Sequence, residues 1–358
     1  MSNIFDCVVI GGGQAGLAAG YYLQREGIRF IILEAGNTPA GSWPHYYDSL
    51  TLFSPSRFSS LPEIEFPGDP NHYPTRNEVI EYLQDYAAHF NFPIRTNTFV
   101  TDISKQKDLF LITSSSGETF ESKHVISASG GFSRPFIPQI SGMDQFQGQI
   151  LHSKDYKNTA PFKGHRVIVV GAGNSAVQIA VELSNDAQVT IATKSPIKFV
   201  PQTFLGKDLH FWITSLGLDH SQSGLVKRIL HAKSVGVLDT GKYQQAINRQ
   251  KPNQNKMFTT FSSNGVIWSD GTEEKVDTVI FATGYQADVS YLSSLGALDS
   301  QGSPLHNNGI SSTVKGLYYV GLPWQRSHAS ATIRGVGPDS AYVVNHIKKE
   351  TARKSSCC

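Results

Sequence analysis

Two short glycine-rich segments have the residue types and spacing needed to hold a nucleotide pyrophosphate. One spans residues 11–16 (GGGQAG), and the other spans 171–176 (GAGNSA). In this pattern the first glycine permits a tight turn, the second lets the backbone approach phosphate, and the third lets helix and strand pack closely. Backbone N–H groups at the positive end of the helix dipole then bind the phosphates. The predicted binding residues are Gly11, Gly13, Gln14, Ala15 and Gly16 at the first site, and Gly171, Gly173, Asn174 and Ser175 at the second.

The strand that follows each segment predicts which nucleotide it binds. After the first segment, the apolar run 30–33 ends in Glu34, which can accept hydrogen bonds from both ribose hydroxyls and would repel a 2′-phosphate. This site suits FAD or NAD. After the second segment, the run 188–192 leads to Lys194, which favours a 2′-phosphate and hence NADPH. A single lysine is a weaker clamp than an arginine, and an ordinary surface lysine is the alternative interpretation, so NADH use stays open.

Elements with the right periodicity surround both segments. Apolar runs at 6–10 and 166–170 predict buried parallel strands, each leading through its glycine turn into a helix. A further helix is predicted over 77–90. The order strand, glycine turn, helix, strand occurs twice, which predicts an α/β fold with two dinucleotide-binding (Rossmann-like) units.

The segment between the two units carries a third signal. The pattern Phe146-x-Gly148-x-x-x-His152-x-x-x-Tyr156 resembles the identifying motif of class B flavoprotein monooxygenases, the group of flavin-containing monooxygenases and Baeyer–Villiger enzymes. The resemblance runs from about residue 5 to 349 and is closest to small bacterial members that use NADPH or NADH. Tyr156 resembles the heteroatom-oxidising branch, because Baeyer–Villiger enzymes usually carry tryptophan there.

This resemblance implies the domain organisation. The NAD(P)H domain is expected to be inserted into the FAD domain. The expected bounds are 1–158 for the first part of the FAD domain, 159–282 for the NAD(P)H domain, and 283–358 for the completion of the FAD domain with its C-terminal helix and tail. That helix is expected to begin after Pro338, with its positive end directed at the flavin.

The resemblance also implies the activity, an FAD-dependent NAD(P)H:O2 monooxygenase. In such enzymes a C4a-(hydro)peroxyflavin oxygenates a small soft nucleophile, such as a sulfide or amine, or a ketone. The alternatives are an NAD(P)H-dependent flavin disulfide or thiol reductase, an uncoupled NAD(P)H oxidase, and a non-catalytic flavin-binding or redox-sensing protein. A reductase would need a redox cysteine near the flavin; the sequence has no Cys-x-x-Cys, and Ala15 stands where one reductase group carries cysteine.

Site residues follow from the same resemblance. The residues expected near the reacting face are Trp43, Ser54, Asn174 and Arg334. Trp43 is also expected to contact FAD, together with Val100, Gly321 and Gly335.

Other positions are expected to play supporting parts. Phe53 fills the place at which many flavin-containing monooxygenases carry asparagine, and Leu322 replaces the aspartate that usually contacts the ribityl chain. His152 is expected to tie the domain linker by hydrogen bonds rather than act as a base. The aromatic residues of the motif-free stretch 201–260 predict either an apolar lid or simple packing.

Composition narrows the possible partners. The chain of 358 residues is 39% hydrophobic and 17% charged, which is ordinary for a globular protein with more than one core. A net charge of +2 without a basic run disfavours nucleic acid. No apolar run approaches the ~20 residues of a membrane span, and no signal-peptide pattern is present, so a cytoplasmic protein is expected. The expected partners are a small-molecule substrate and O2, and a homodimer is compatible with the sequence.

The three cysteines predict no disulfide framework and no metal site. Cys7 is expected to be buried in the first strand. Cys357 and Cys358 end a polar tail that is expected to be disordered, and a redox or metal-binding pair is the less favoured interpretation.

Overall fold

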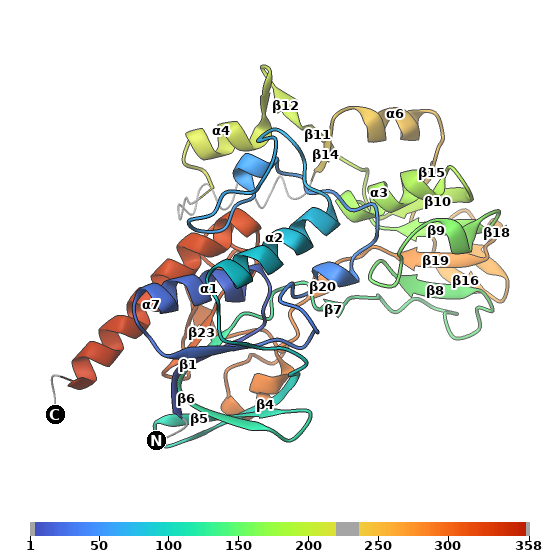
Figure 1. The fold of residues 1–358 in the computed structure, drawn as a ribbon. Coiled ribbons are helices and arrows are strands. Elements are labelled where there is room, and N and C mark those ends of the chain that lie inside the picture. The colour runs from blue at the N-terminus through green and yellow to red at the C-terminus, as the bar shows by residue number, and fades with distance from the viewer. Residues whose placement is uncertain (1–3, 220–235, 356–358) are drawn as a thin grey trace.

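The computed structural model describes residues 4–219 and 236–355, and these form two lobes (Figure 1). Each lobe contains one of the glycine-rich segments at the end of a parallel strand. The structure therefore confirms the predicted α/β fold with two dinucleotide-binding units. The pair Cys357 and Cys358 lies outside the described residues.

The larger lobe is built on a nine-stranded sheet in the order β21-β22-β23-β6-β1-β2-β3, with β5 and β4 joined through β6. Strand β1 is parallel to both of its neighbours, β2 and β6. The strands are β1 (Ile4–Ile10), β2 (Phe30–Leu33), β3 (Ile94–Arg95), β4 (Val100–Gln106), β5 (Leu109–Ser114), β6 (Thr119–Ser127), β21 (His306–Asn307), β22 (Ile310–Ser311) and β23 (Leu317–Tyr319).

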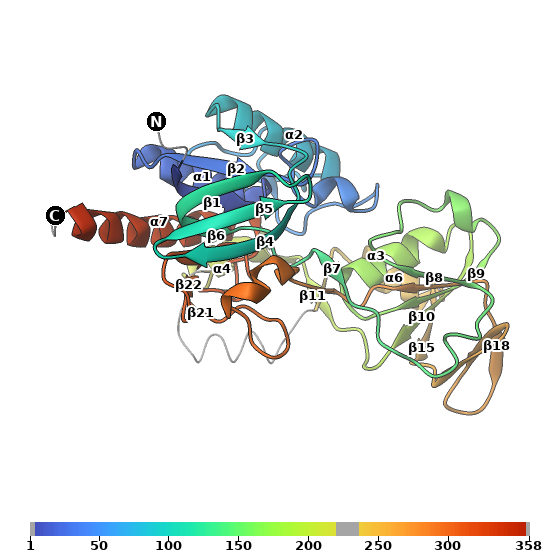
Figure 2. The same ribbon diagram turned by 90° about the horizontal axis from the view of Figure 1, so that it is seen from below.

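Both faces of this sheet are covered. The helices α1, α2 and α7 pack their apolar sides onto one face, and the β4–β5 hairpin with the turn η4 covers the other (Figure 2). Cys7 is fully buried in β1, and burial raises the pKa of its thiol, so it packs as an inert apolar residue as predicted. The elements are α1 (Gln14–Arg25), α2 (Arg76–His89), α7 (Ile333–Ser355), η1 (Trp43–His45), η2 (Ser56–Phe58) and η4 (Ser290–Leu295).

The start of one helix lies close to its predicted position, and the start of another does not. Helix α2 begins one residue before the predicted position, where Thr75 and Glu78 form a capping box. The predicted start of the last helix after Pro338 is wrong, because α7 already begins at Ile333 and contains Pro338. A proline this close to a helix start removes only one backbone hydrogen bond, the one to the Arg334 carbonyl, so the helix can extend past it.

The smaller lobe contains a five-stranded parallel sheet in the order β15-β10-β9-β19-β8. Helix α3 packs on one face, and aromatic residues of the β16-β17-β18 sheet pack on the other. The outer strand β8 precedes residue 159, and the expected domain bounds stay a prediction. The elements are β8 (Gln149–His152), η3 (Ala160–Phe162), β9 (Arg166–Val170), α3 (Asn174–Leu183), β10 (Gln188–Thr193), α6 (Lys242–Asn248), β15 (Asn253–Lys256), β16 (Thr260–Ser262), β17 (Gly265–Ile267), β18 (Glu273–Lys275) and β19 (Thr278–Phe281).

The chain passes between the lobes twice, and the two passages lie side by side. Strand β7 (Arg134–Pro135) on the outward passage pairs antiparallel with β20 (Tyr285–Gln286) on the return. Buried His152 joins this region: Nδ1 accepts from the Lys154 N–H at 3.1 Å, so Nε2 carries the proton and donates to the Gly284 carbonyl at 3.0 Å. Burial lowers the pKa of His152. The predicted linker role of His152 is confirmed.

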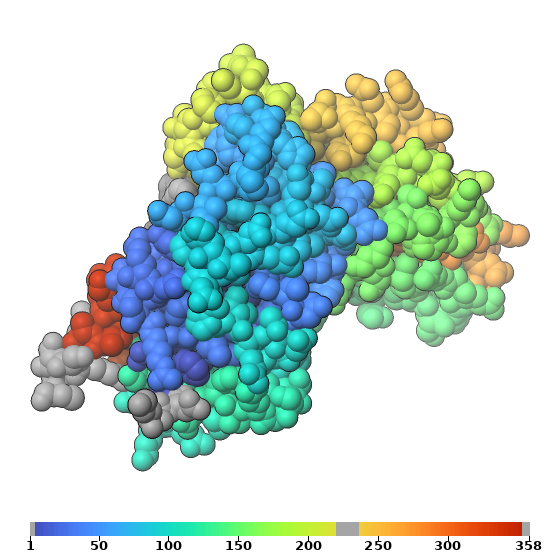
Figure 3. Space-filling model, viewed as in Figure 1, coloured from blue at the N-terminus to red at the C-terminus, as the bar shows by residue number. Residues whose placement is uncertain are grey.

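One segment of the smaller lobe reaches back over the larger lobe (Figures 1 and 3). We call residues 199–219 the strap. It contains β11 (Phe199–Pro201), the hairpin of β12 (Thr203–Phe204) and β13 (Lys207–Asp208), and α4 (Leu209–Ser215). Strand β11 is anchored in its own lobe by parallel pairing with β14 (Val237–Asp239). Among the described residues, no helix is long and apolar enough to cross a bilayer, and no cluster of His, Cys, Asp and Glu is arranged to hold a metal.

Candidate functional site

The first glycine turn has the geometry that the sequence predicted. Gly11 has φ +105°, a conformation that side-chain-bearing residues rarely adopt. A Cβ on Gly16 would fall 1.8 Å from the Gly11 carbonyl oxygen, so helix α1 packs against the turn at a distance that only glycine allows. Buried Glu34 accepts from the N–H groups of Gly12 at 2.5 Å and Gly36 at 2.7 Å. These bonds fix the carboxylate at the strand tip, where a ribose is expected.

The second turn leaves open space at the position that a pyrophosphate would approach. A Cβ added to Gly173 would meet no atom within 4 Å, and α3 begins at the next residue. The Asn174 side chain accepts from the Leu238 N–H at 3.0 Å through its carbonyl oxygen, which leaves its amide N–H groups for a ligand. Ser175 lies in the first turn of α3.

Two lysines lie at the edge of the second sheet where a 2′-phosphate is expected. Lys194 is exposed just after β10, as the sequence implied. The adjacent strand β15 ends in exposed Lys256, whose register partner is Thr193. Sequence analysis missed Lys256, because only the parallel pairing of β10 with β15 brings these distant positions together.

On the FAD side, one glutamine joins three separate segments. The Gln14 side chain accepts from the Trp43 indole N–H at 2.6 Å and donates to the Ala331 carbonyl at 3.1 Å. It therefore holds the Trp43 segment and the loop before α7 against the start of α1. Trp43 was expected near the flavin, and this network orients its ring.

The other expected FAD contacts lie in the same lobe. Gly321 has φ +88°, and a Cβ there would lie 2.8 Å from Ala15 Cβ, so this glycine closes against the first turn. A Cβ on Gly335 would fall 1.8 Å from the Ala329 carbonyl oxygen, so the start of α7 packs tightly on its own loop. Val100 is buried at the first position of β4.

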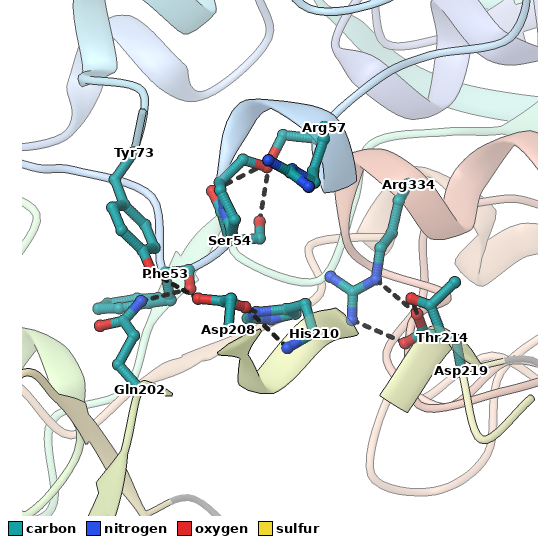
Figure 4. Close-up of polar contacts among 12 residues, drawn as sticks. Phe53, Ser54, Arg57, Tyr73, Gln202, Asp208, His210, Thr214, Asp219 and Arg334 are labelled. Carbon is teal, nitrogen blue, oxygen red and sulfur yellow. Dashed lines mark hydrogen bonds and ion pairs between the residues drawn. The ribbon is translucent and has the colours of Figure 1, made fainter. Parts of the chain in front are cut away.

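One residue of the strap, Gln202, contacts the segment that carries Ser54, an expected reacting-face residue. The Gln202 amide donates to the Phe53 carbonyl at 2.8 Å. Next to Phe53, the hydroxyl of Ser54 pairs with the Ser59 hydroxyl at 2.9 Å. Figure 4 shows Phe53 and Ser54 on the side of the larger lobe that faces the strap.

Arg334, at the second residue of α7, is held by the far end of the strap. Its guanidinium binds both carboxylate oxygens of Asp219, at 2.8 and 3.1 Å, and the two side chains are only 12% and 2% exposed. Thr214 donates to the same carboxylate at 2.8 Å. The charge of Arg334 is therefore neutralised within the protein.

A carboxylate–imidazole pair that sequence analysis missed lies in the middle of the strap. Asp208 caps α4 and binds the His210 ring at 2.8 Å, and Tyr73 of the larger lobe donates its hydroxyl to the same carboxylate (Figure 4). No motif covers this stretch. An Asp two residues before a His was the one available signal, and alone it is commonplace.

The described residues fit FAD in the larger lobe and NADPH in the smaller one. The first turn supplies a buried acid for an unphosphorylated ribose, and the second supplies open backbone space and two lysines. The one cysteine among the described residues is Cys7, which is buried in β1 and cannot serve as a redox thiol. A cavity of about 610 Å³ between α3 and α6 contains none of the predicted site residues.

Comparisons with known proteins agree with this geometry. The family model described as pyridine nucleotide-disulphide oxidoreductase matches residues 8–321. The chain is 38% identical to an uncharacterized CzcO-like oxidoreductase of Geobacillus kaustophilus, over 97% of this chain and 99% of the relative. It is 30% identical to the indole-3-pyruvate monooxygenase YUCCA8 of Oryza sativa subsp. indica, over 88% of this chain and 85% of the relative.

A solved structure covers almost the whole chain. The flavin-containing monooxygenase from Stenotrophomonas maltophilia superimposes with a TM-score of 0.85 at 31% identity, covering 98% of this chain and 100% of that chain. The chain therefore belongs to the pyridine nucleotide-disulphide oxidoreductase family and, within it, to the class B flavin monooxygenases, which use FAD and NADPH.

Proposed function

We propose that this monooxygenase oxygenates a small, soft nitrogen or sulfur nucleophile, with NADPH as the preferred reductant and NADH as an accepted one. The observation that carries the proposal is the strap, which extends from the NADPH lobe to Phe53 and Arg334 in the FAD lobe. A segment placed in this way can cover the space between the two nucleotides. Tyr156, at the position where Baeyer–Villiger enzymes usually carry tryptophan, supports a heteroatom over a ketone.

FAD, when bound, supplies the oxygen-activating chemistry, and the chain supplies position, electrostatics and exclusion of water. Glu34 would hold the adenosine ribose of FAD, and the N–H groups at the starts of α1 and α3 would bind the two pyrophosphates. The positive end of α7 would stabilise negative charge on a flavin bound next to it. Among the residues proposed for the reacting face, Trp43 is oriented by Gln14, while Ser54 and Arg334 line the side that the strap covers.

The strap limits the access of water. Gln202, His210 and Asp219 are each less than a tenth exposed, although they belong to a segment that leaves its own lobe. Burial at this contact keeps bulk water from the reacting face, which suppresses wasteful release of peroxide. The Asn174 amide is proposed to orient the nicotinamide, and Lys194 with Lys256 to bind the 2′-phosphate.

The test is an oxygen-uptake assay on purified, FAD-loaded protein with a panel of sulfides, amines and ketones, and with both nicotinamides. We expect oxygenated product in step with NADPH consumption for at least one heteroatom donor, with little H2O2. An uncoupled NAD(P)H oxidase is the rival, and conversion of all consumed NADPH into H2O2 with every donor would establish it. Reduction of a disulfide in the absence of O2 would instead support a reductase. The proposed domain bounds (1–158, 159–282 and 283–358) and the homodimer remain predictions.

A further inference from the structure

We propose that His210, oriented by Asp208 and Tyr73, is the catalytic base that takes a proton from an amine substrate. The inference rests on the proposed function and adds to it a substrate class, primary and secondary amines, and a residue that contacts the substrate. It is carried by the hydrogen bonds around the ring, its burial, and its position between the lobes.

The hydrogen bonds fix which ring nitrogen carries the proton. Asp208 Oδ1 accepts from the His210 backbone N–H at 2.7 Å and from Nδ1 at 2.8 Å, and Tyr73 donates to Oδ2. Burial and the neighbouring carboxylate raise the pKa of Tyr73, so its hydroxyl stays a donor. An ionised carboxylate can only accept, so Nδ1 of the ring carries its hydrogen. The neutral ring therefore presents Nε2 as a proton acceptor.

None of the described residues is a hydrogen-bond partner of this acceptor. The His210 side chain is 9% exposed, yet none of the described residues hydrogen-bonds Nε2. Nε2 is not fully enclosed by the described residues, so this unused acceptor on an oriented ring is accessible to a ligand. By contrast, both ring nitrogens of His152 are used by the protein.

The ring lies where the strap meets the FAD lobe. Figure 4 shows His210 on α4, between Asp208 and Arg334 and facing the segment that carries Ser54. It packs against Phe58 of that segment, with ring centroids 6.3 Å apart. The two expected reacting-face residues, Ser54 and Arg334, therefore flank the ring from different FAD-lobe segments.

The charges around the ring favour a cationic ligand. Arg334 is neutralised by Asp219, and Arg57, on the turn beside Ser54, is exposed and bound to Pro70 and Asn71. Tyr73 is uncharged, so among the described residues that contact the ring, Asp208 carries the uncompensated charge. A carboxylate in this place stabilises an ammonium ligand before proton transfer and the imidazolium after it.

An amine needs such a base, and a thioether does not. At neutral pH an alkylamine is mostly an ammonium ion, which has no lone pair with which to attack oxygen. His210 Nε2 takes that proton, after which the N–O bond forms and the O–O bond breaks. The balanced reaction is R–NH3+ + O2 + NADPH → R–NHOH + H2O + NADP+. NADPH and the nitrogen each supply two electrons, and the proton held by His210 leaves in the water.

The experiment compares benzylamine with benzyl methyl sulfide on the FAD-loaded full chain. In His210→Asn, the new amide can still donate to Asp208, but the acceptor at the Nε2 position is gone. We expect kcat/KM for benzylamine at pH 7 to fall about 100-fold, the scale of general-base catalysis, while the sulfide changes little. The loss should shrink as pH rises and free amine becomes abundant. His72→Asn is the control, because His72 also pairs with a carboxylate, through Nε2 to Glu78, but on an exposed surface.

A second readout does not depend on turnover. In FAD-loaded protein labelled with ¹⁵N-histidine, benzylamine should shift the Nε2 resonance that disappears in His210→Asn, and the sulfide should not. Equal loss of both activities in His210→Asn, or no shift with benzylamine, would show a structural role and overturn the inference while leaving the proposed function intact. Oxygenation of the sulfide without any oxygenation of the amine would refute the substrate class. If the wild type turns all NADPH into H2O2 with benzylamine while another donor of the panel is oxygenated, this inference alone fails; if every donor gives only H2O2, the proposed function fails with it.

Discussion

Lys194 and Lys256 are single charges on neighbouring strands, and the coenzyme preference proposed here depends on them. Replacing either with alanine should raise the KM for NADPH by roughly tenfold, the value of one charge-assisted hydrogen bond of about 1.5 kcal/mol. The KM for NADH should change much less, because NADH lacks the 2′-phosphate. Steady-state kinetics with both coenzymes checks this, with Lys275→Ala, an exposed lysine on β18, as the control. Equal effects on the KM values of both coenzymes would show that the lysine does not bind the 2′-phosphate.

Substitution of Gly173 tests coenzyme binding without disturbing the fold. Its φ of −92° suits any residue, and its missing side chain leaves open space, so Gly173→Val should fold and keep its flavin. The valine should block the approach of NADPH to the turn and raise its KM severely. Gly16→Val should instead lose FAD, because its Cβ would collide with the Gly11 carbonyl. Flavin absorbance of the purified proteins and NADPH titration measure the two effects, and an unchanged KM in Gly173→Val would contradict the assignment.

At the scale of elements, strand β19 is fixed to β9 by an ion pair at their starts. Arg166 binds Asp277 through its side chain at 2.5 and 2.9 Å and through its backbone N–H at 2.8 Å, and these bonds lower the pKa of Asp277 to about 2. Because the folded-state pKa is depressed, this stabilisation is full above the unfolded value of about 3.9 and is lost as pH falls through about 2.

Asp277→Asn should therefore lower the free energy of unfolding by about 1 kcal/mol at pH 7, a discounted value because both side chains are over a third exposed. The difference from wild type should disappear as pH approaches 2. Urea unfolding at a series of pH values checks it, with exposed Asp144→Asn as the control. A difference that persists at pH 2 would show that the carboxylate charge is not responsible.

The elements show which features a sequence can predict. The glycine turns, the position of Glu34 at the end of β2 and the helices α1 to α3 follow from signals within a few residues of each other, and these positions agree with the structure, whereas ribose binding by Glu34 stays a prediction. The pair Asp208 and His210 depends on Tyr73, 135 residues away, and Lys256 depends on a strand pairing. Neither contact leaves a local pattern. The start of α7 was misplaced because proline is a weaker stop near a helix start than inside a helix.

At the scale of the whole molecule, the ion pair of Arg334 with Asp219 joins the two lobes in a nearly dry environment. Asp219→Asn would leave the Arg334 charge buried without its counter-charge, at a cost of about 3 kcal/mol. The double variant Asp219→Leu with Arg334→Met removes both charges and should be distinctly more stable than the single variant. Thermal unfolding of the FAD-loaded proteins measures this. If the single and double variants have the same melting temperature, the unpaired charge of Arg334 is not the cause of the destabilisation.

The pairing of β7 with β20 has a consequence for how the molecule comes apart. The two segments that connect the lobes lie side by side. A protease that cleaves one of them leaves the other connection intact. The severed N-terminal fragment still contributes β1, the middle of its sheet, flanked on both sides by neighbouring strands. Both connecting segments must be cleaved before the two lobes are no longer covalently linked.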